Sequence, residues 1–194
     1  MIQPTKWRWA AMGIFAIMQG CALHPENIRI DPTVDLPHSL VGSAKTIGVA
    51  VSDARETKKL GEVGDPNRQM YDISVNEDPS PAIYTRVSNA LAKLGYKVVP
   101  YSEGMEPSLK IAVETLKLES DKRAFDFLTT LHAEVAAHAR NGKESLNKRY
   151  IVNQSMNTAG PAYTSDTTRL VNGAVSTALQ DMLADQLLLD MLNK

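Results

Sequence analysis

The clearest alternation of apolar and small residues lies between residues 45 and 52. There, Ile47, Val49 and Val51 fall on one face of an extended segment. Such a run predicts a strand that is buried in a sheet. The residues that follow, 53–80, are polar and punctuated by glycine and proline, which predicts a long excursion with room for a hairpin.

Two later segments carry apolar residues at helical spacing. Ser80 followed by Pro81 is a helix-start signal, and Gly95 supplies a stop. Residues 167–192 carry a second helical stripe, which predicts a long C-terminal helix with Gly173 as a weak point. The apolar positions of the first helix are Ile83, Val87, Leu91 and Leu94.

The region between these helices has the pattern of long strands. Residues 109–118 alternate, but the parity of their apolar positions shifts near Thr115, which predicts a β-bulge. Residues 127–140 are ambiguous, because their alanines suit a helix while apolar and polar residues alternate as in a strand. We assign a strand, and Asn141-Gly142 then predicts a tight hairpin turn before a returning strand.

Together these elements predict an α+β fold in a single domain. Its sheet is mixed or antiparallel, with the amphipathic mid-chain helix and the long C-terminal helix packed on it. A length of 194 residues suits one domain, and a content of 43% hydrophobic and 22% charged residues is typical of globular proteins.

The N-terminal residues 1–20 have the three-part layout of an export signal. Lys6 and Arg8 precede an apolar stretch, 9–18, that is far shorter than the roughly 20 residues of a membrane-spanning helix. The only cysteine of the chain, Cys21, follows directly. We therefore assign residues 1–20 to a lipoprotein signal peptide.

The end of this leader, Ile17-Met18-Gln19-Gly20-Cys21, resembles a bacterial lipobox. The resemblance implies that Cys21 becomes the first residue of the mature chain and carries diacylglycerol on its sulfur and a further acyl chain, such as palmitate, on its amine. Several acyl chains together anchor a protein durably to a membrane. The alternative is an ordinary secretory leader that is cleaved after Ala22.

Prolines dominate the segment between this cysteine and the first strand. Pro25, Pro32 and Pro37 each remove a backbone donor from residues 21–43, which predicts a tether or an edge strand. We expect residues 44–194 to form the α+β domain, which the lipobox resemblance implies lies in the periplasm.

Charge and cysteine content exclude several classes of function. Two of the 21 Lys and Arg side chains lie in the leader, so 19 remain against 22 Asp and Glu, a net charge of −3 for the mature chain. That balance gives no field to attract nucleic acid, and we expect no nucleic-acid partner. A single cysteine at the anchor also excludes disulfides and thiolate metal sites in the body.

Candidate chemistry is sparse. His132 and His138 share one strand face with Glu134, but positions six residues apart on a strand are roughly 20 Å apart, too far to share a metal ion. Asp53 and Arg55 are the candidate ligand-binding residues, because ligands often bind where buried strands end. The alternative for this pair is a simple ion pair or turn cap. No catalytic or cofactor-binding motif occurs, so we expect no catalytic residue, no metal and no cofactor.

Several short stretches follow the leader in a defined order. They are Ile28-Arg29-Ile30-Asp31-Pro32, Leu36-Pro37, residues 47–51 running into Asp53-Ala54-Arg55, Leu60-Gly61 and Leu94-Gly95-Tyr96. In this order behind Cys21 they resemble the YajG-type family of uncharacterised bacterial lipoproteins over essentially the whole chain. The resemblance implies an envelope lipoprotein with an α+β body. Because Ala22 rather than aspartate follows Cys21, the sorting rule of Gram-negative lipoproteins implies the outer membrane, facing the periplasm.

These observations favour a non-enzymatic lipoprotein that binds or scaffolds an envelope protein or the cell wall. A lipid anchor raises the effective concentration of such a binding module toward its neighbours on the membrane. The alternative is a periplasmic small-ligand carrier or enzyme that uses the corner at Asp53 and Arg55, with the 53–80 excursion as a lid.

Overall fold

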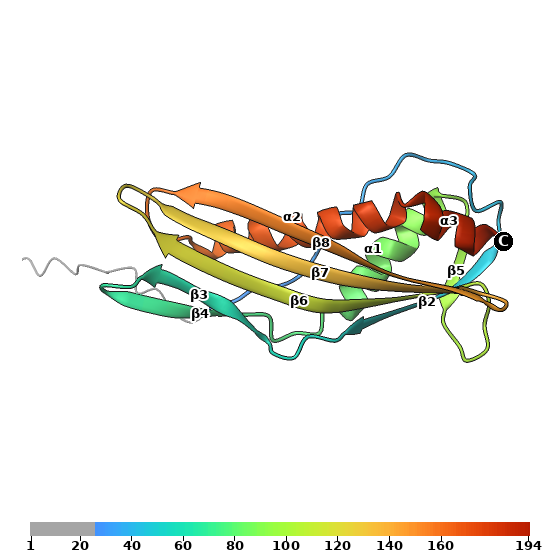
Figure 1. Cartoon of the computed structure of the whole chain (residues 1–194), viewed down its shortest axis with the longest axis horizontal. Coiled ribbons are helices and arrows are strands. Elements are labelled where there is room, and N and C mark those ends of the chain that lie inside the picture. The colour runs from blue at the N-terminus through green and yellow to red at the C-terminus, as the bar shows by residue number, and fades with distance from the viewer. Residues whose placement is uncertain (1–25) are drawn as a thin grey trace, which may run out of the picture.

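The structure is built on one mixed β-sheet with helices along one side (Figure 1). This computed structural model describes residues 26–194, which contain eight strands and three helices. This arrangement, with a helix in mid-chain and helices at the C-terminus, confirms the predicted α+β class. The strands are β1 (Glu26–Asn27), β2 (Thr46–Asp53), β3 (Lys59–Asp65), β4 (Gln69–Ser74), β5 (Lys97–Pro100), β6 (Ser108–Lys122), β7 (Phe127–Asn141) and β8 (Glu144–Thr158). The helices are α1 (Ser80–Lys93), α2 (Thr164–Leu183) and α3 (Gln186–Asn193).

Strand β6 is the centre of the sheet, because it pairs with three other strands. Its first part, Ser108 to Val113, pairs in parallel with β2, and its residue Leu118 pairs in parallel with Gly61 of β3. Along its opposite edge β6 pairs antiparallel with β7, which in turn pairs with β8. Beyond β2 lies β5, and beyond β3 lie β4 and then β1. Two short strands therefore share one edge of β6.

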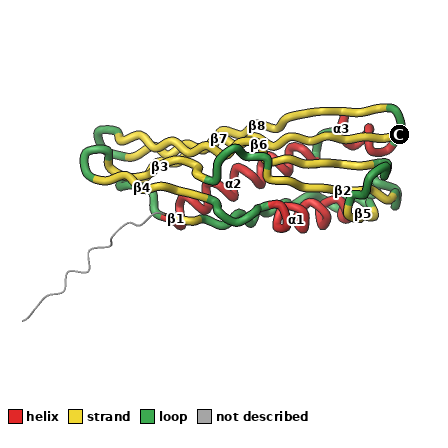
Figure 2. Tube along the Cα trace, turned by 90° about the horizontal axis from the view of Figure 1, so that it is seen from below, coloured by secondary structure: helices red, strands yellow, loops and turns green. Residues whose placement is uncertain are grey.

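Strands β6, β7 and β8 are each 15 residues long, and the body is elongated along them (Figures 1 and 2). Every second residue of β7 from Phe127 to Ala139 is buried on the side that α2 and α3 contact. The strand assignment for residues 127–140 is thus confirmed. The predicted bulge in β6 is confirmed as well, because the register with β7 shifts between Val113 and Thr115.

The β7–β8 hairpin confirms the tight turn but places it one residue later than the dipeptide suggested. Asn141 pairs with Glu144, so the two loop residues are Gly142 and Lys143. Gly142 has a φ of +62°, a left-handed conformation that glycine adopts at little cost.

The C-terminal helical region differs from the single long helix that the sequence predicted. The chain runs through Gly173 without interruption and breaks instead after Leu183. Asp185 lies at the break, where its carboxylate accepts a hydrogen bond from the backbone N–H of Leu187 and so caps α3. The same carboxylate accepts a hydrogen bond of 2.6 Å from the Tyr150 hydroxyl, which ties the break to β8.

The proline-containing segment before β2 is bound to the body along most of its length. β1 is a two-residue edge strand parallel to β4, and the side chains of Ile28 and Ile30 are buried directly after it. Further on, the backbone N–H of Asp31 donates to Asn172 of α2 at 2.7 Å, and that of Thr33 donates to Ser176 at 2.8 Å. Residues 28–33 therefore form a strap that runs along α2.

The predicted signal peptide and the predicted lipidation site, Cys21, lie outside the described residues. Among residues 26–194, no helix is both long enough and apolar enough to cross a membrane.

Gly61 is the residue of β3 that pairs with β6, so a substitution at Gly61 tests this pairing. A Cβ added to Gly61 would lie 2.0 Å from the carbonyl oxygen of Leu118, which is a backbone atom that cannot move aside. We expect Gly61→Ala to lower the free energy of unfolding by at least about 2 kcal/mol, because overpacking against backbone is costly. Urea unfolding followed by far-UV circular dichroism measures the change.

The matched control is Gly160→Ala, since a Cβ at Gly160 would meet no atom of the described part of the chain within 4 Å. It should change the free energy of unfolding by no more than about 0.5 kcal/mol. Equal effects of the two substitutions would contradict the close approach of β3 to β6.

Candidate functional site

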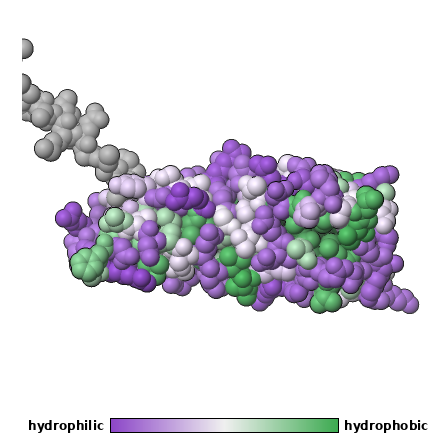
Figure 3. Space-filling model, turned by 90° about the horizontal axis from the view of Figure 1, so that it is seen from above, coloured by the Kyte–Doolittle hydropathy of each residue, from purple (hydrophilic) through white to green (hydrophobic). Residues whose placement is uncertain are grey.

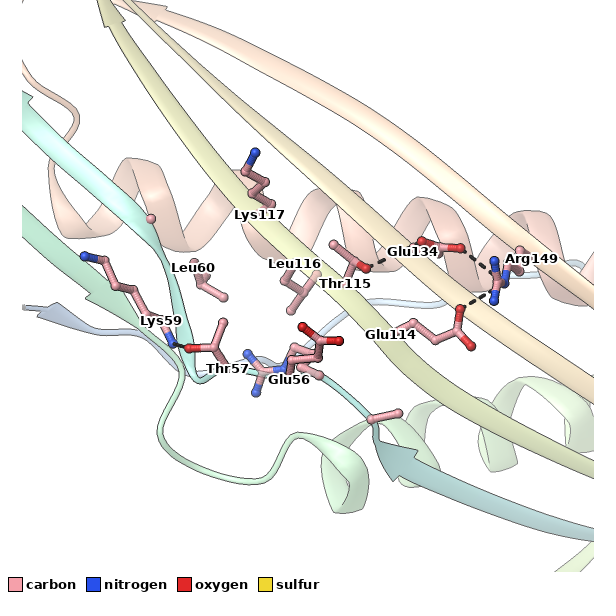
Figure 4. Close-up of a pocket in the computed structure, with 13 residues that line it drawn as sticks. Glu56, Thr57, Lys59, Leu60, Glu114, Thr115, Leu116, Lys117, Glu134 and Arg149 are labelled. Carbon is pink, nitrogen blue, oxygen red and sulfur yellow. Dashed lines mark hydrogen bonds and ion pairs between the residues drawn. The ribbon is translucent and has the colours of Figure 1, made fainter.

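The candidate site is a cavity where the sheet divides. β2 leaves β6 after the pair Asp53 and Val113, and β3 rejoins it only at the pair Gly61 and Leu118. Between these points residues 54–58 bow away from β6. The space that they leave is an open cavity of about 720 Å³ (Figure 4).

The cavity has an apolar base and a charged rim. The buried side chains of Leu60 and Leu116 come from the two strands that flank it. Charged side chains enter it from the bowed segment, from β3 and β6, and from β7 and β8 (Figure 4). These charged residues are Arg55, Glu56, Lys59, Glu114, Lys117, Glu134 and Arg149. A ligand with both polar and apolar parts fits such a lining.

Three charged side chains on one wall of the cavity form a network. The Nε atom of Arg149 lies 3.0 Å from a carboxylate oxygen of Glu114 and 3.3 Å from one of Glu134 (Figure 4). The hydroxyl of Thr115 donates to the other carboxylate oxygen of Glu134 at 3.5 Å. The side chain of Glu134 is only 16% exposed, so its charge is held in place within a partly desolvated wall.

The two predicted ligand-binding residues, Asp53 and Arg55, bind each other. The Arg55 Nε and Nη2 atoms donate to the two carboxylate oxygens of Asp53 at 2.7 and 2.8 Å, and both side chains are at most 5% exposed. Lys58 adds a third contact at 2.6 Å. The Arg55 guanidinium, helped by Lys58, holds the pKa of Asp53 well below its usual range.

Only one member of this pair reaches the cavity. Arg55 lines it, whereas Asp53 lies behind, among the residues that fix the guanidinium. The remaining nitrogen, Nη1 of Arg55, is buried and has no hydrogen-bond partner among the described residues. The corner therefore offers one unsatisfied donor next to the cavity.

The two strand histidines lie apart and are each satisfied by an asparagine of β8. His132 Nδ1 lies 2.8 Å from the side-chain oxygen of Asn153, and His138 Nδ1 contacts Asn147 in the same way. Within residues 26–194, no group of three potential metal ligands comes together.

Sequence reasoning did not identify Glu114 or Arg149 as site residues. Glu114 falls at the bulge, where the side-chain parity of β6 changes, and Arg149 belongs to the returning strand. The signal that could have found Arg149 is the turn at Gly142, because the unbroken register from that turn places Arg149 opposite Ala136. β6 pairs with the other edge of β7, and this register places Glu114 on the same wall of the cavity as Arg149.

Comparison with known proteins identifies relatives among lipoproteins. Residues 32–193 match the family described as uncharacterized lipoproteins. The chain is similar to the uncharacterized lipoprotein YajG of Escherichia coli strain K12, with 25% identity over 174 residues that cover 87% of each chain. The protein of the same name from strain O6:H1 matches equally well.

Two solved structures resemble the body with low scores. One is described as a neuraminyllactose-binding hemagglutinin homolog from Helicobacter pylori, with 8% identity, a TM-score of 0.46, and coverage of 87% of this chain and 95% of the other. The other is the lipoprotein GNA1162 of Neisseria meningitidis, with 14% identity, a TM-score of 0.33, and coverage of 69% and 96%.

The buried pair at the edge of the cavity makes a prediction about pH. Because the pKa of Asp53 is lowered in the folded state, the pair stabilises the fold above the ordinary pKa of aspartate, about 3.9, and this contribution is lost as the pH falls through the folded pKa. Asp53→Asn should therefore destabilise the protein by about 3–5 kcal/mol near pH 7. Urea unfolding at several pH values should show this difference shrinking in acid.

Asp35→Asn is the control, because Asp35 also pairs with a lysine, Lys93, but its side chain is 80% exposed. That substitution should leave the unfolding midpoint almost unchanged, since exposed pairs contribute little. A destabilisation by Asp53→Asn that is constant with pH would mean that the charge of the pair is unimportant.

Proposed function

We propose, because this chain belongs to the family of uncharacterized lipoproteins, that it is an outer-membrane lipoprotein whose body binds another envelope component in the periplasm without catalysing a reaction. The leader and its flanking residues support the location, and the charged wall of the cavity supports the binding role.

The proposed location follows from the leader and the residue after it. The chain has one cysteine, Cys21, directly behind a short apolar stretch, and family membership supports its use as the lipid-bearing residue. Several acyl chains on one residue suffice for durable anchoring. Ala22 at the next position supports sorting to the outer membrane rather than retention at the inner one.

The proposed binding role is carried by the network of Arg149 with Glu114 and Glu134 on the cavity wall. Each of these ionisable groups is already held by an opposite charge, at 3.0 and 3.3 Å, so they form fixed donors and acceptors for recognition. Catalysis by a general acid or base would instead need a group whose proton is free to transfer. We therefore propose an envelope protein or the cell wall as the partner, contacted through polar groups at the cavity.

A small ligand in the same cavity is the second candidate, and the free nitrogen of Arg55 favours it. Nη1 of Arg55 is buried and has no hydrogen-bond partner within residues 26–194, and it lies beside a cavity that is large enough for a small molecule. Its unused donor would suit a carboxylate or another anionic oxygen. A thermal shift of the wild-type protein with a panel of small carboxylates tests this candidate, because a ligand that binds only the folded state raises its melting temperature.

The residue that follows Cys21 should determine whether the protein resides in the inner or the outer membrane. We expect Ala22→Asp to move the protein from the outer-membrane fraction to the inner-membrane fraction of a sucrose gradient, because aspartate at this position is the retention signal of the sorting rule. Ala22→Ser keeps a small neutral residue there and should leave the protein in the outer membrane.

Mass spectrometry of the mature N-terminus supplies the second readout for this experiment. It should show a triacylated Cys21 as the first residue. A mature chain that begins at an unmodified Leu23 would refute the lipid anchor, and outer-membrane location of both variants would refute the sorting argument alone.

The cavity wall should be needed for partner capture. We expect Arg149→Met to reduce, by about tenfold or more, the amount of any specific partner co-isolated from crosslinked envelopes, since loss of a central arginine at an interface costs about 2 kcal/mol or more. Quantitative mass spectrometry of the captured material measures the ratio to wild type.

Arg140→Met is the matched control, because Arg140 also lies in a strand of the same sheet and pairs with a glutamate, Glu106, at 2.8 Å, but it lies outside the cavity. The two arginines are 59% and 65% exposed, so the variants lose similar surface charge. Equal capture by both variants would contradict a role of the cavity, and the absence of any specific partner would contradict the binding function.

A further inference from the structure

We propose that the tip of the β6–β7 hairpin, centred on Phe125, inserts into the membrane interface beside the lipid anchor. This inference rests on the proposed lipidation of Cys21. It adds a second contact with the bilayer, made by the folded body itself. Two contacts would fix the direction in which the body stands on the membrane, which one flexible attachment point cannot do.

The exposed aromatic side chains of the described residues gather at one end of the body. Phe125 lies in the loop 123–126 and is 96% exposed. Tyr163 is 63% exposed and lies just after β8, whose last residue, Thr158, pairs with Phe127 at the base of the same loop. Phenylalanine and tyrosine are costly to expose to water, and aromatic rings favour the interface of a bilayer.

The hairpin of β3 and β4 ends at the same place. Lys122, the last residue of β6, lies with its Nζ atom 2.6 Å from a carboxylate oxygen of Asp65, the last residue of β3. The two hairpin tips are therefore joined side by side, as the strands at the left of Figures 1 and 2 show. We call this the aromatic end of the body.

The direction of β1 determines from which side the preceding chain enters the body. β1 runs parallel to β4 with Glu26 opposite Ile73, so the chain enters β1 from the side of Gln69, which belongs to the aromatic end. The path from Ile73 back to Gln69 is about 13 Å. Cys21 precedes Glu26 by only five residues, which span at most about 17 Å. An anchor on Cys21 can thus reach the level of Gln69 at the aromatic end.

The opposite end of the body is out of reach of the same anchor. β6 runs the length of the sheet, so its two ends are separated by about 48 Å. Leu40, which is 84% exposed, lies at that far end, where its backbone packs beside Gly95 close to the start of β2. An anchor near Glu26 therefore brings the bilayer to the aromatic end and keeps it from Leu40.

The surface seen from above carries apolar side chains at both ends of the body, and more of them toward the far end than at the aromatic end. Figure 3 shows a small apolar patch at the left-hand tip within a largely hydrophilic surface, and further apolar areas toward the other end. The areas at the other end include exposed aliphatic side chains, but among the described large hydrophobic residues that are exposed, only Phe125 and Tyr163 are aromatic. Aromatic rings are enriched at the membrane interface, which favours the end that carries Phe125 and Tyr163.

The sequence provides a direct reporter for this contact. Both tryptophans of the chain, Trp7 and Trp9, lie in the leader, so the mature protein has none. We would introduce Phe125→Trp into the full-length protein, isolate the mature lipidated form and reconstitute it in vesicles of phosphatidylethanolamine and phosphatidylglycerol. Its emission should shift to shorter wavelength, and lipids brominated near the headgroup should quench it, as expected for a depth of about 5–10 Å.

Two further single-tryptophan variants complete the experiment. Tyr163→Trp, at the same end, should show a smaller shift of the same sign, and Leu40→Trp, at the far end, should show no shift and no quenching. All three positions are exposed, so the substitutions should leave the fold intact, which far-UV circular dichroism verifies.

The outcomes separate the membrane contact from the lipid anchor. Co-flotation of the wild-type protein with the vesicles, together with a shift for F125W alone or with Y163W, supports the proposal. Co-flotation without a shift for F125W overturns the contact but keeps the anchor, and a shift for L40W instead overturns the proposed orientation. Failure of the wild-type protein to float with the vesicles overturns both. A shift of F125W that lipid bromines do not quench would point to a second copy or another protein at the tip and would also overturn the proposal.

Discussion

The backbone of β6 sets the shape of the body, because its donors and acceptors need partners along two edges. β7 is as long as β6 and pairs with it along one edge from Ser108 to Lys122, apart from the bulge at Glu114. On the other edge, β2 pairs with the first part and β3 only with Leu118. The residues between, Glu114 to Lys117, lie beside the cavity instead of beside a strand. The cavity is thus a consequence of covering one long strand with two short ones.

The bulge in β6 falls at the same place and gives the cavity its charged wall. An extra residue in one strand changes the direction of the side chains that follow it. At Glu114 and Thr115 this change lets neighbouring side chains of β6 act on one network, with Thr115 bonded to Glu134 and Glu114 bonded to Arg149. A regular strand would alternate these two side chains between the faces. The break in pairing and the assembly of the site therefore have a common cause.

Small residues where the helices meet the sheet allow the helices to lie close to it. β7 buries Ala133, Ala137 and Ala139 on its helical side. In α2, a Cβ added to Gly173 would meet the amide of Gln154 on β8 at 3.0 Å. The glycine that the sequence marked as a weak point is thus a point of close contact, and neighbouring packing outweighs its low helix propensity. The helix ends instead where Asp185 has partners in β8.

The strands and helices with a strict period could be predicted from sequence, and the excursion 53–80 indicated the hairpin that β3 and β4 form, but the pairing of β3 with β6 could not be predicted. Alternation was sufficient for β2, β7 and the bulge, and the helical repeat was sufficient for α1. β3 contains Gly61 and Gly64 and lacks alternation, because close approach to β6 matters there more than side-chain pattern. The site could be predicted only in part, because its charged wall combines β6, β7 and β8 through their register. The place of Asp53 and Arg55 at the end of a strand identified them as candidate site residues. The sequence alone could not show that their side chains bind each other.

The position of the cavity along β6 connects the proposed binding role with the proposed orientation. From Lys122, at the aromatic end, back to Leu116 on the cavity base is six residues, or about 20 Å of strand. With the aromatic end against the bilayer, the cavity would open at about this height and to the side, because it lies on an edge of β6 and not at its tip. A partner there would need to stand on or close to the same membrane. The anchor would then raise the effective concentration of the body toward this partner, so that even a weak binding site at the cavity would be occupied. Orientation would thus determine which envelope components can reach the site.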